Sequence, residues 1–389
     1  MPNPLPVLIA GGGIGGLSTA IALARAGIDA TVLERSTVAE ESGAGIQLGP
    51  NATRILRKLG VLDVLSPQAF SPEAIWLFDG LSGRRLATVP LGDAAEQRYG
   101  APYLTLHRAD LHAGLRAAAE AAAPVSFSSG FDVSGIEARD EITVANVDGT
   151  TMQGASLIGA DGLWSTVRKW MAPEAALSFT GATAFRALLP RGGLPEPFAS
   201  PIVGLWLGPG AHLVHYPVRA GSALNVVAVT ESGQPGDGWN QAADAAALLA
   251  GFTGWCKESK SLLELAEGWR AWSLFSLPQL PVWSRGAVTL LGDAAHPVQP
   301  YLAQGAGLAI EDAAMLASCL SAAPEDPASA FHTYETARRA RATRLQTTAR
   351  RFGRIYHLRG PARVARNAAL GYRSEAAALR QFDWLYGEA

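Results

Sequence analysis

Residues 11–16 read GGGIGG, and this short run constrains the fold of the chain more than any other feature. It follows a short apolar segment at 5–10 and precedes residues 17–26, in which Ala, Ile and Leu recur at helical spacing. A second apolar run at 30–33 ends at Glu34. Strand, glycine turn, helix and strand in this order predict a βαβ unit that carries the dinucleotide-binding fingerprint.

The glycines of this loop suit the close approach of a phosphate. They let the backbone turn tightly, and the N–H groups at the start of the following helix then face a pyrophosphate. Glu34, at the end of the next strand, is placed to accept hydrogen bonds from a ribose diol. FAD and NAD both offer an adenosine ribose, so Glu34 does not separate them. The alternative is a glycine-rich turn without a ligand.

Two more strand ends carry an aspartate. Asp161 follows the apolar run SLIGA, and Asp293 follows VTLLG. Because the carboxyl ends of parallel strands meet at one edge of a sheet, several such contacts suggest one long ligand that runs across the sheet. This arrangement fits a dinucleotide.

Length and composition limit the class of protein. The chain has 389 residues, of which 48% are hydrophobic and 17% charged, with a net charge of −2. These values predict a globular protein with more than one domain and disfavour nucleic-acid binding. Its two cysteines, Cys256 and Cys319, have neither metal-ligand nor redox spacing, so we expect no metal site and a reducing cytoplasm. We find neither a signal peptide nor an apolar stretch of the roughly 18 residues that a membrane span needs.

The order of segments predicts an α/β fold with a discontinuous second domain. Strand-like segments at 71–98 and 176–275 interrupt the α/β framework, a helix-like pattern covers 103–122 and 241–266, and the chain looks helical after 305. We therefore expect a Rossmann-like FAD-binding domain at 1–70, 99–175 and 276–340. A β-rich substrate domain would comprise 71–98 and 176–275, and a C-terminal helical segment 341–389.

Three motifs in order give the chain a family resemblance. They are GGGIGG with Glu34, ADGLWSTVR at 160–168, and GDAAHPVQPYLAQGAGLAIEDA at 292–313. In this order they resemble the single-component FAD-dependent aromatic hydroxylases, the family typified by p-hydroxybenzoate hydroxylase. The pattern is similar to that of the salicylate hydroxylase, 3-hydroxybenzoate 6-hydroxylase and 6-hydroxynicotinate 3-monooxygenase types. The resemblance covers nearly the whole chain.

The resemblance implies FAD as the cofactor and NADH or NADPH as co-substrate. Asp293 would bind the ribityl chain or a water at the phosphates, Arg108 the flavin or a phosphate, and Asp161 both FAD and the nicotinamide cofactor. The full set of implied cofactor contacts is Gly11, Gly13, Ile14, Gly15, Gly16, Glu34, Arg35, Gln47, Arg108, Asp161, Asp293, Gly305, Ala306 and Gly307.

The resemblance also implies the reaction. NAD(P)H reduces the flavin, reduced flavin adds O₂ to give a C4a-hydroperoxide, and this species hydroxylates an electron-rich ring. The protein must orient the ring and promote its hydroxyl toward phenolate. His212 and Tyr216 are the candidates for substrate contact and catalysis. They lie four apart in a strand-like segment, so they point to one face and His215 to the other. The alternative for His212 is a satisfied sheet histidine.

Further substrate contacts are candidates with open alternatives. Arg186 suits a substrate carboxylate, but an ion pair or a flavin contact would use the same residue. Trp206 is a candidate pocket wall or a core residue, and Pro300 stiffens the loop that faces the substrate. His296, in the GDAAHP segment, favours a structural or flavin-loop role over catalysis. The basic run at 338–351 predicts a solvated helix face.

Two other functions remain open from the sequence, and within the hydroxylase class itself so does epoxidation or N-hydroxylation of a different ring. One is a flavin-dependent dehydrogenase or reductase on the same fold without oxygen insertion, and the other is a non-catalytic flavin binder. The expected partners are a small aromatic substrate, O₂ and NAD(P)H, without nucleic acid or membrane, and with a homodimer as one option. The ring, the position hydroxylated and the choice of NADH or NADPH stay undetermined.

Overall fold

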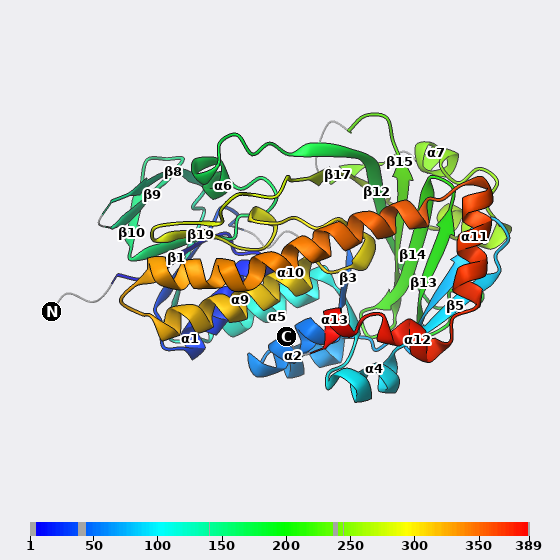
Figure 1. Cartoon of the computed structure of the whole chain (residues 1–389), viewed down its shortest axis with the longest axis horizontal. Coiled ribbons are helices and arrows are strands. Elements are labelled where there is room, and N and C mark those ends of the chain that lie inside the picture. The colour runs from blue at the N-terminus through cyan, green and yellow to red at the C-terminus, as the bar shows by residue number, and fades with distance from the viewer. Residues whose placement is uncertain (1–4, 38–43, 140, 236–239, 244, 388–389) are drawn as a thin grey trace.

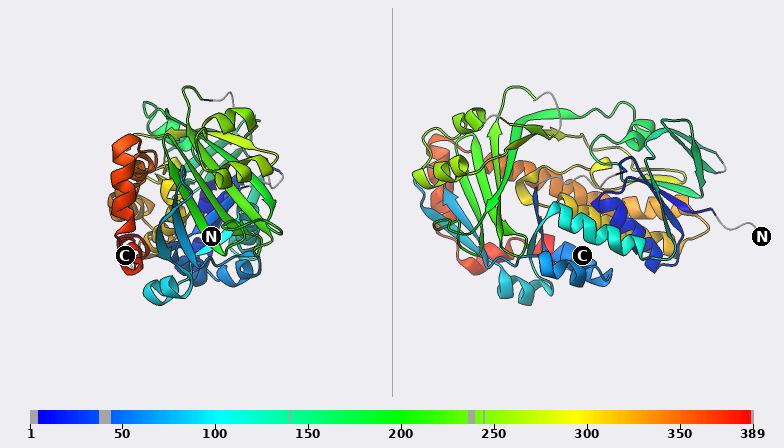
Figure 2. Two further views of the ribbon diagram at one scale, coloured as in Figure 1. Left: turned by 90° about the vertical axis from the view of Figure 1, so that its right-hand side faces the viewer. Right: turned by 180° about the vertical axis from the view of Figure 1, so that it is seen from behind.

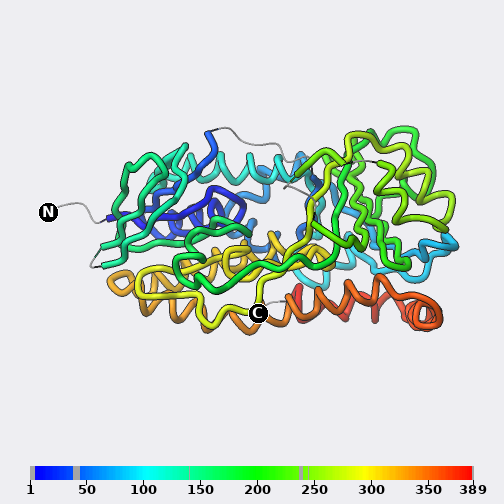
Figure 3. Tube along the Cα trace, turned by 90° about the horizontal axis from the view of Figure 1, so that it is seen from above, coloured from blue at the N-terminus to red at the C-terminus, as the bar shows by residue number. Residues whose placement is uncertain are grey.

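The computed structural model describes residues 5–37, 44–139, 141–235, 240–243 and 245–387. A mainly parallel sheet and a mainly antiparallel sheet lie toward opposite ends of the long axis of the molecule, and helices run between them (Figures 1 and 3). This mixed α/β architecture confirms the predicted fold class.

The first sheet has the strand order β18-β19-β11-β1-β2-β7. All neighbours in it run parallel except β18 and β19. β1, β11 and β19 are buried along their whole lengths, as expected for strands covered on both faces. The strands are β1 (Val7–Ala10), β2 (Ala30–Glu34), β7 (Val125–Ser129), β11 (Ser156–Gly159), β18 (Ser284–Arg285) and β19 (Val288–Leu290).

The register of this sheet brings the three sequence motifs to one edge. Ala10 at the end of β1 pairs with Gly159 of β11, and Gly159 pairs with Leu290 of β19. The GGGIGG, GADG and GD segments therefore leave the sheet side by side. The predicted βαβ unit is confirmed, with α1 (Ile14–Arg25) as its helix.

Helices and a small sheet cover this parallel sheet. α1, α5 (Arg108–Glu120) and α9 (Gly305–Ala322) pack together on one side, and the three-stranded sheet β8 (Val133–Ala138), β9 (Ile142–Asn146) and β10 (Thr151–Gly154) lies on the other (Figure 1). The remaining shorter elements are β3 (Gly45–Leu48), β6 (Leu104–His107), α2 (Pro50–Lys58), α3 (Leu62–Leu65), α4 (Gly92–Tyr99), α6 (Thr166–Met171), α7 (Ala245–Ala250) and α8 (Lys257–Leu265), with the 3₁₀ turns η1 (Ser66–Gln68), η2 (Gly292–Ala294) and η3 (Pro300–Leu302).

The second sheet has the order β16-β17-β12-β15-β14-β13-β4-β5. It joins the two segments that the sequence marks as β-rich, because β4 from the first pairs in parallel with β13 from the second. We therefore propose the predicted domain division over the described residues. The strands are β4 (Ala74–Asp79), β5 (Arg85–Pro90), β12 (Ser178–Pro190), β13 (Ile202–Gly208), β14 (Ala211–Val218), β15 (Ala223–Glu231), β16 (Gln241–Ala242) and β17 (Arg270–Ser276).

One long helix connects the two sheets. α10 (Pro327–Tyr356) begins where the Asp326 carboxylate accepts a hydrogen bond from the N–H of Ser329, with Pro327 in the first turn. Its 30 residues span about 45 Å. Figure 1 shows that α10 runs from beside α9 to the antiparallel sheet. There α11 (Gly360–Gly371) and α12 (Glu375–Arg380) pack on β5, and α13 (Asp383–Tyr386) follows (Figure 2).

Three sequence expectations are wrong. Residues 104–107 of the helix-like pattern form β6, which pairs with β3, because the run LTLH is a buried strand before the helix. The sequence predicts no segment with the length and apolar composition of a membrane span. α9 does reach the length and mean hydropathy of such a span, but 61% of it is buried inside the protein. It also carries the buried acids Glu311 and Asp312, so its apolar character is that of a core helix. Arg338, in the basic run, is not solvated but only 4% exposed.

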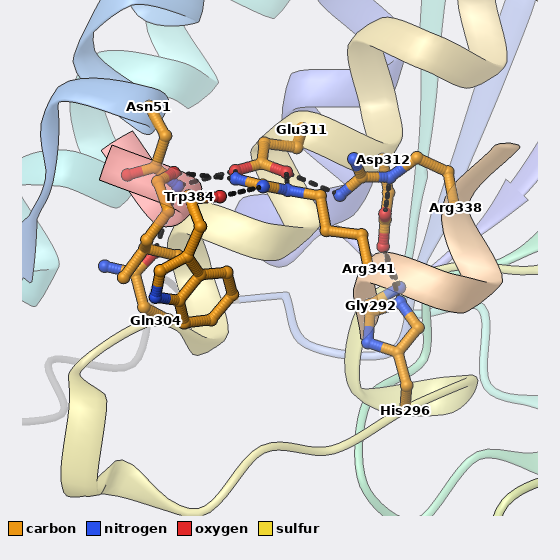
Figure 4. Close-up of polar contacts among 10 residues, drawn as sticks. Asn51, Gly292, His296, Gln304, Glu311, Asp312, Arg338, Arg341 and Trp384 are labelled. Carbon is orange, nitrogen blue, oxygen red and sulfur yellow. Dashed lines mark hydrogen bonds and ion pairs between the residues drawn. The ribbon is translucent and has the colours of Figure 1, made fainter. Parts of the chain in front are cut away.

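A buried charge cluster explains the position of Arg338 (Figure 4). Asp312 is fully buried and accepts hydrogen bonds from Arg338 Nε at 2.7 Å and from the N–H of Gly292 at 3.3 Å, and His296 Nε2 lies 2.6 Å from the same carboxylate. Burial by itself raises the pKa of the Asp312 carboxyl, but His296 and Arg338 outweigh this and hold that pKa below its usual range. The resulting stability is present above the unfolded pKa of about 4 and is lost as the pH falls through the lower folded value.

The neighbouring acid extends the cluster to two more elements. Glu311 accepts from Arg338 at 2.7 Å, from Arg341 at 2.5 and 2.7 Å, and from the Asn51 amide of α2 at 2.6 Å. Arg341 also donates to the carbonyl of Trp384 near the C-terminus, at 3.0 Å. The cluster thus fixes α9 against α10, α2, α13 and the loop that follows β19.

We expect Arg338→Met to lower the free energy of unfolding by about 3 kcal/mol, because it leaves the fully buried Asp312 with less compensation. Arg351→Met, at an exposed position of the same helix, should change it by less than about 0.5 kcal/mol. Urea unfolding of both variants measures the difference. If both variants lost the same free energy of unfolding, Arg338 would contribute no more to stability than an exposed arginine does.

Candidate functional site

Two glycines of the first loop are required by packing. Gly11 has a φ of +102°, and a Cβ on it would lie 2.6 Å from the carbonyl oxygen of Ala160. A Cβ on Gly16 would lie 1.9 Å from the carbonyl oxygen of Gly11. These positions let α1 start directly beneath the ends of β1 and β11.

Gly13 differs because it faces open space. It has an ordinary extended φ of −76°, and a Cβ on it would meet no atom within 4 Å. It is the N-cap of α1, and neither a side-chain cap nor an acidic residue serves that helix start. Four N–H groups at a helix start lack intrahelical partners, so Gly13 leaves them open to an anion.

Ile14 and Gly15 contribute to the site differently from Gly13. The Ile14 side chain is 6% exposed and belongs to the main core. A Cβ on Gly15 would lie 2.8 Å from a methyl of Leu291 and 3.4 Å from Cβ of Ala309. Gly15 therefore lets α1 pack against α9. Ile14 and Gly15 can contact a cofactor only through their main-chain groups.

Glu34 is fixed at the end of β2. Its Oε2 accepts a hydrogen bond from the N–H of Gly12 at 2.7 Å, and its Oε1 accepts from the N–H of Ser36 at 2.8 Å. Each carboxylate oxygen has a second acceptor position for a ribose hydroxyl. Arg35 is exposed beside it.

The GADG segment places a second carboxylate at this edge. Asp161 Oδ2 accepts from the N–H groups of Thr166 and Val167 at 2.7 and 3.1 Å, which caps α6, whereas Oδ1 is buried without a protein partner. Burial raises the pKa of the Asp161 carboxyl. Arg168, 2% exposed, donates to the carbonyls of Leu163 and Ala294 and so joins this segment to the GD loop.

Asp293 points away from the packed interior of the GD loop. Its side chain is exposed, yet enough protein surrounds it that burial raises the pKa of its carboxyl, against the opposing charges of His296, Arg108 and Arg168. A side chain that is both accessible and enclosed fits the wall of a ligand-binding site. Arg108, at the start of α5, is also exposed.

The start of α9 repeats the geometry of Gly13. Gln304 is its N-cap, but the Gln304 side chain accepts from Asn51 at 3.0 Å and does not cap the helix. A Cβ on Gly305 would meet no atom within 4 Å, and Ala306 is partly accessible. Gly307 instead allows packing, because a Cβ there would lie 3.0 Å from Gln304 Oε1.

These observations fit FAD. The uncapped start of α1 with its open Gly13 and the unpaired oxygen of Asp161 follow neighbouring strands of one sheet edge, and α9, which packs on α1, has a second uncapped start with the open Gly305. A model of the FAD binding domain family matches residues 4–349. The chain belongs to the FAD-dependent aromatic hydroxylase family. This membership establishes FAD as the cofactor and confirms the resemblance that the motifs suggest.

The relatives of this hydroxylase support the same assignment. It is 38% identical over 388 residues to the 3-hydroxybenzoate 6-hydroxylase of Polaromonas naphthalenivorans (strain CJ2), covering 99% of this chain and 96% of that protein. It is 36% identical over 351 residues to the 6-hydroxynicotinate 3-monooxygenase of Bordetella bronchiseptica (strain ATCC BAA-588 / NCTC 13252 / RB50), with 87% and 89% covered. A salicylate hydroxylase substrate complex superposes with a TM-score of 0.84 at 25% identity, over 100% and 97% of the two chains.

In this hydroxylase, His212, Tyr216 and Arg186 share one face of the antiparallel sheet. His212, Val214 and Tyr216 are spaced two apart along β14 and so point to one face. Val214 lies beside Val227 of β15, which lies beside Arg186 of β12. The predicted opposite orientation of His215 is confirmed by the same register. His212 and Tyr216 are each 3% exposed.

Tyr216 lies in a polar group that includes Arg186 and Gln47. Burial raises the pKa of Tyr216 to about 12, although the charge of Arg186 and the contact with Gln47 oppose the shift. The Tyr103 hydroxyl donates to Gln47 Oε1 at 2.7 Å. Sequence analysis missed Tyr103, and recognising 104–107 as a strand beside β3 would have placed it here.

Arg186 is a half-buried cation without a carboxylate partner among the described residues. Its guanidinium carbon lies 4.7 Å from the ring centre of Trp272, and its Nε is buried without a hydrogen-bond partner. Burial lowers the pKa of Arg186 to about 10, and the nearby charge of Arg108 adds to this effect while Tyr216 opposes it. A bound anion, such as a ligand carboxylate, would offset the cost of desolvating this guanidinium.

Trp206 does not belong to this group. It pairs in register with Leu213, and so lies on the opposite face of the sheet from His212 and Tyr216. There it stacks on Phe78 at 4.2 Å and packs beside Phe198 in the outer core. The substrate-wall prediction for Trp206 is wrong, because strand alternation turns it away, and the core alternative holds.

The loop that carries Pro300 reaches His212. Pro300 starts η3, and the ring of the next residue, Tyr301, lies 5.4 Å from the His212 ring. A Cβ on Gly353 of α10 would lie 2.6 Å from the Tyr301 ring, so a glycine is needed where this loop packs on the helix. His296, in the same loop, is bound to Asp312, in line with a structural role.

We expect Gly13→Ala to leave the unfolding transition of the apoprotein unchanged, because its Cβ meets nothing, yet to raise the Kd for FAD at least about tenfold, or about 1.4 kcal/mol. Gly16→Ala should instead destabilise the apoprotein itself. Thermal unfolding and flavin titration of both variants separate the two effects. Unchanged FAD affinity in Gly13→Ala would remove this glycine from the phosphate site.

Proposed function

We propose that this protein is a monooxygenase that uses FAD, NAD(P)H and O₂ to hydroxylate a small aromatic acid with a ring hydroxyl. The observation that supports this best is Arg186, a half-buried cation that has no carboxylate partner among the described residues and a buried, unpaired Nε, on the same sheet face as Tyr216 and His212. The relatives named above act on hydroxybenzoate and hydroxynicotinate, and each of these compounds carries both a carboxylate and a ring hydroxyl.

The cofactor contacts follow from the open positions at the sheet edge. Glu34 would bind the adenosine ribose, the helix start at Gly13 the pyrophosphate, Asp293 the ribityl chain, and the start of α9 at Gly305 and Ala306 the ring system. Bound FAD, once reduced by NAD(P)H, supplies the activation of O₂. The helix starts contribute fixed N–H groups that stabilise negative charge.

The proposed substrate contacts lie at two positions along β14. Tyr216 and His212 lie four residues apart, so their Cα atoms are separated by about 13 Å and a substrate that reaches both side chains must lie along β14. Arg186 would bind the carboxylate beside Tyr216. His212 would face the ring hydroxyl, and its free ring nitrogen would accept that proton. Pro300 and Tyr301 would restrict access of water.

The remaining assignments are coarser. Cys256 and Cys319 are free thiols, which accords with the predicted cytoplasmic location. The homodimer stays a prediction, as do the choice of NADH or NADPH and the position hydroxylated.

The direct test is NAD(P)H oxidation by the purified FAD-loaded protein with 3-hydroxybenzoate, 6-hydroxynicotinate and salicylate, with product and peroxide measured separately. We expect one of them to accelerate flavin reduction and to give a hydroxylated product. Reduction without oxygen insertion for every acid would favour a dehydrogenase or reductase, and no turnover would favour a flavin binder.

We expect Arg186→Met to raise the KM for the preferred acid about 10- to 100-fold, because a charge-assisted pair contributes about 1.5–3 kcal/mol. Oxidation of the decarboxylated analogue, phenol or hydroxypyridine, should change little. Arg270→Met, an exposed arginine of the neighbouring strand β17, is the control. An equal effect on acid and analogue would contradict the carboxylate contact.

A further inference from the structure

A chain of ionisable groups leads from His212 to the surface. His212 Nδ1 lies 2.9 Å from Nε2 of His357, the residue that ends α10. His357 Nδ1 in turn lies 3.8 Å from Oε1 of Glu231, at the end of β15. The exposed fraction rises along the chain, from 3% for His212 to 9% for the His357 side chain and 52% for that of Glu231.

The main chain holds His357 in this place. Its carbonyl accepts a hydrogen bond from the N–H of Gly210 at 3.3 Å, in the turn between β13 and β14. The preceding residue, Tyr356, donates its hydroxyl to the carbonyl of Tyr301 at 3.1 Å. The end of α10 is therefore attached both to the strand that carries His212 and to the η3 loop.

The two carboxylate oxygens of Glu231 face different partners. Arg359, just after α10, binds its Oε2, which leaves Oε1 toward His357. A carboxylate favours a proton on the facing imidazole nitrogen, so neutral His357 carries its hydrogen on Nδ1 and presents a lone pair at Nε2. That lone pair accepts the Nδ1–H of His212, and His212 Nε2 is left without a hydrogen.

Burial, more than the surrounding charges, keeps both rings neutral near pH 7. Burial, and then the charge of His357, hold the pKa of His212 well below its usual range. Burial lowers the pKa of His357 to about 4, with Glu231 opposing and Arg359 and Arg366 of α11 adding to the shift. Tyr301 of η3 and Tyr356 of α10 also face His212.

We propose that His357 is a positioning residue that sets the tautomer of His212 and, with Glu231, carries the substrate proton out of the site. The inference rests on the proposed function. His212 Nε2 takes the proton of the ring hydroxyl while His212 Nδ1 passes its own proton to His357 Nε2. His357 Nδ1 then releases its proton to solvent on the side of Glu231, whose Oε1 lies 3.8 Å away and favours the departure of a cation in that direction. One proton leaves the substrate, one reaches solvent, and both imidazoles end neutral as the opposite tautomers, which proton exchange or ring rotation resets.

Two substitutions separate positioning from proton transfer. In His357→Gln the amide oxygen can still accept the Nδ1–H of His212, but it cannot pass a proton on. In His357→Ala both functions are lost. His332→Gln, an exposed histidine of α10, is the matched control, and Glu231→Gln tests the far end.

The measurement is kcat and KM for hydroxylation of 3-hydroxybenzoate by the FAD-loaded enzymes, from about pH 5 to about pH 9, in H₂O and D₂O. If 3-hydroxybenzoate is not turned over, 6-hydroxynicotinate replaces it. We expect His357→Ala to lower kcat about 100-fold with FAD content unchanged, and imidazole in the buffer to restore part of it. His357→Gln should keep the wild-type KM but show a lower kcat with a larger solvent isotope effect, and Glu231→Gln a smaller loss.

The relay is overturned if both His357 variants stay within about twofold of His332→Gln in kcat and keep its pH profile. It is also overturned if His357→Ala fails only by losing FAD or by unfolding while His357→Gln is normal. A wild-type enzyme that hydroxylates neither acid would overturn the proposed function, and the relay with it. An active wild type with equally active variants would overturn the relay alone.

Discussion

The contact between the first turn of α1 and the second turn of α9 is the constraint on which the site depends. Gly15 leaves no side chain between α1 and the residues Leu291 and Ala309, so the two helix starts come together at the edge of the parallel sheet. Each start lacks a side-chain cap and has an open glycine. Two sets of unpaired N–H groups thereby face one region, which is what a long ligand with a pyrophosphate at one end and a polar ring at the other requires.

Such a close contact needs a rigid support, and buried charges provide it. Glu311 and Asp312 follow each other on α9 and point their carboxylates at Arg338, Arg341 and His296. Buried ion pairs contribute little net stability when compared with apolar packing, but they tolerate few other arrangements, because each unpaired charge is costly. We infer that the cluster fixes the GD loop and the start of α9 in one position relative to α10.

α10 also links the cofactor edge to the antiparallel sheet. Its beginning packs on α9, and its far end reaches the antiparallel sheet (Figure 1). There His357, the residue after α10, lies against His212. The face of the sheet that His212, Tyr216 and Arg186 share is therefore held from two directions, by its own strand register and by this helix. The opposite face, with Trp206 and His215, packs into a separate outer core.

The sequence by itself determined the features that depend on local spacing. The glycine loop with Glu34, the aspartates that follow β11 and β19, and the shared strand face of His212 and Tyr216 were all predicted, because backbone turns and a two-residue period are local properties. β6 was missed, since a four-residue apolar strand directly before a helix resembles part of that helix. Only the tertiary structure decided which face Trp206 occupies, that Arg338 is buried, and that His357 meets His212 from 145 residues away. Those outcomes depend on which elements pack together, and no local pattern in the chain records that pairing.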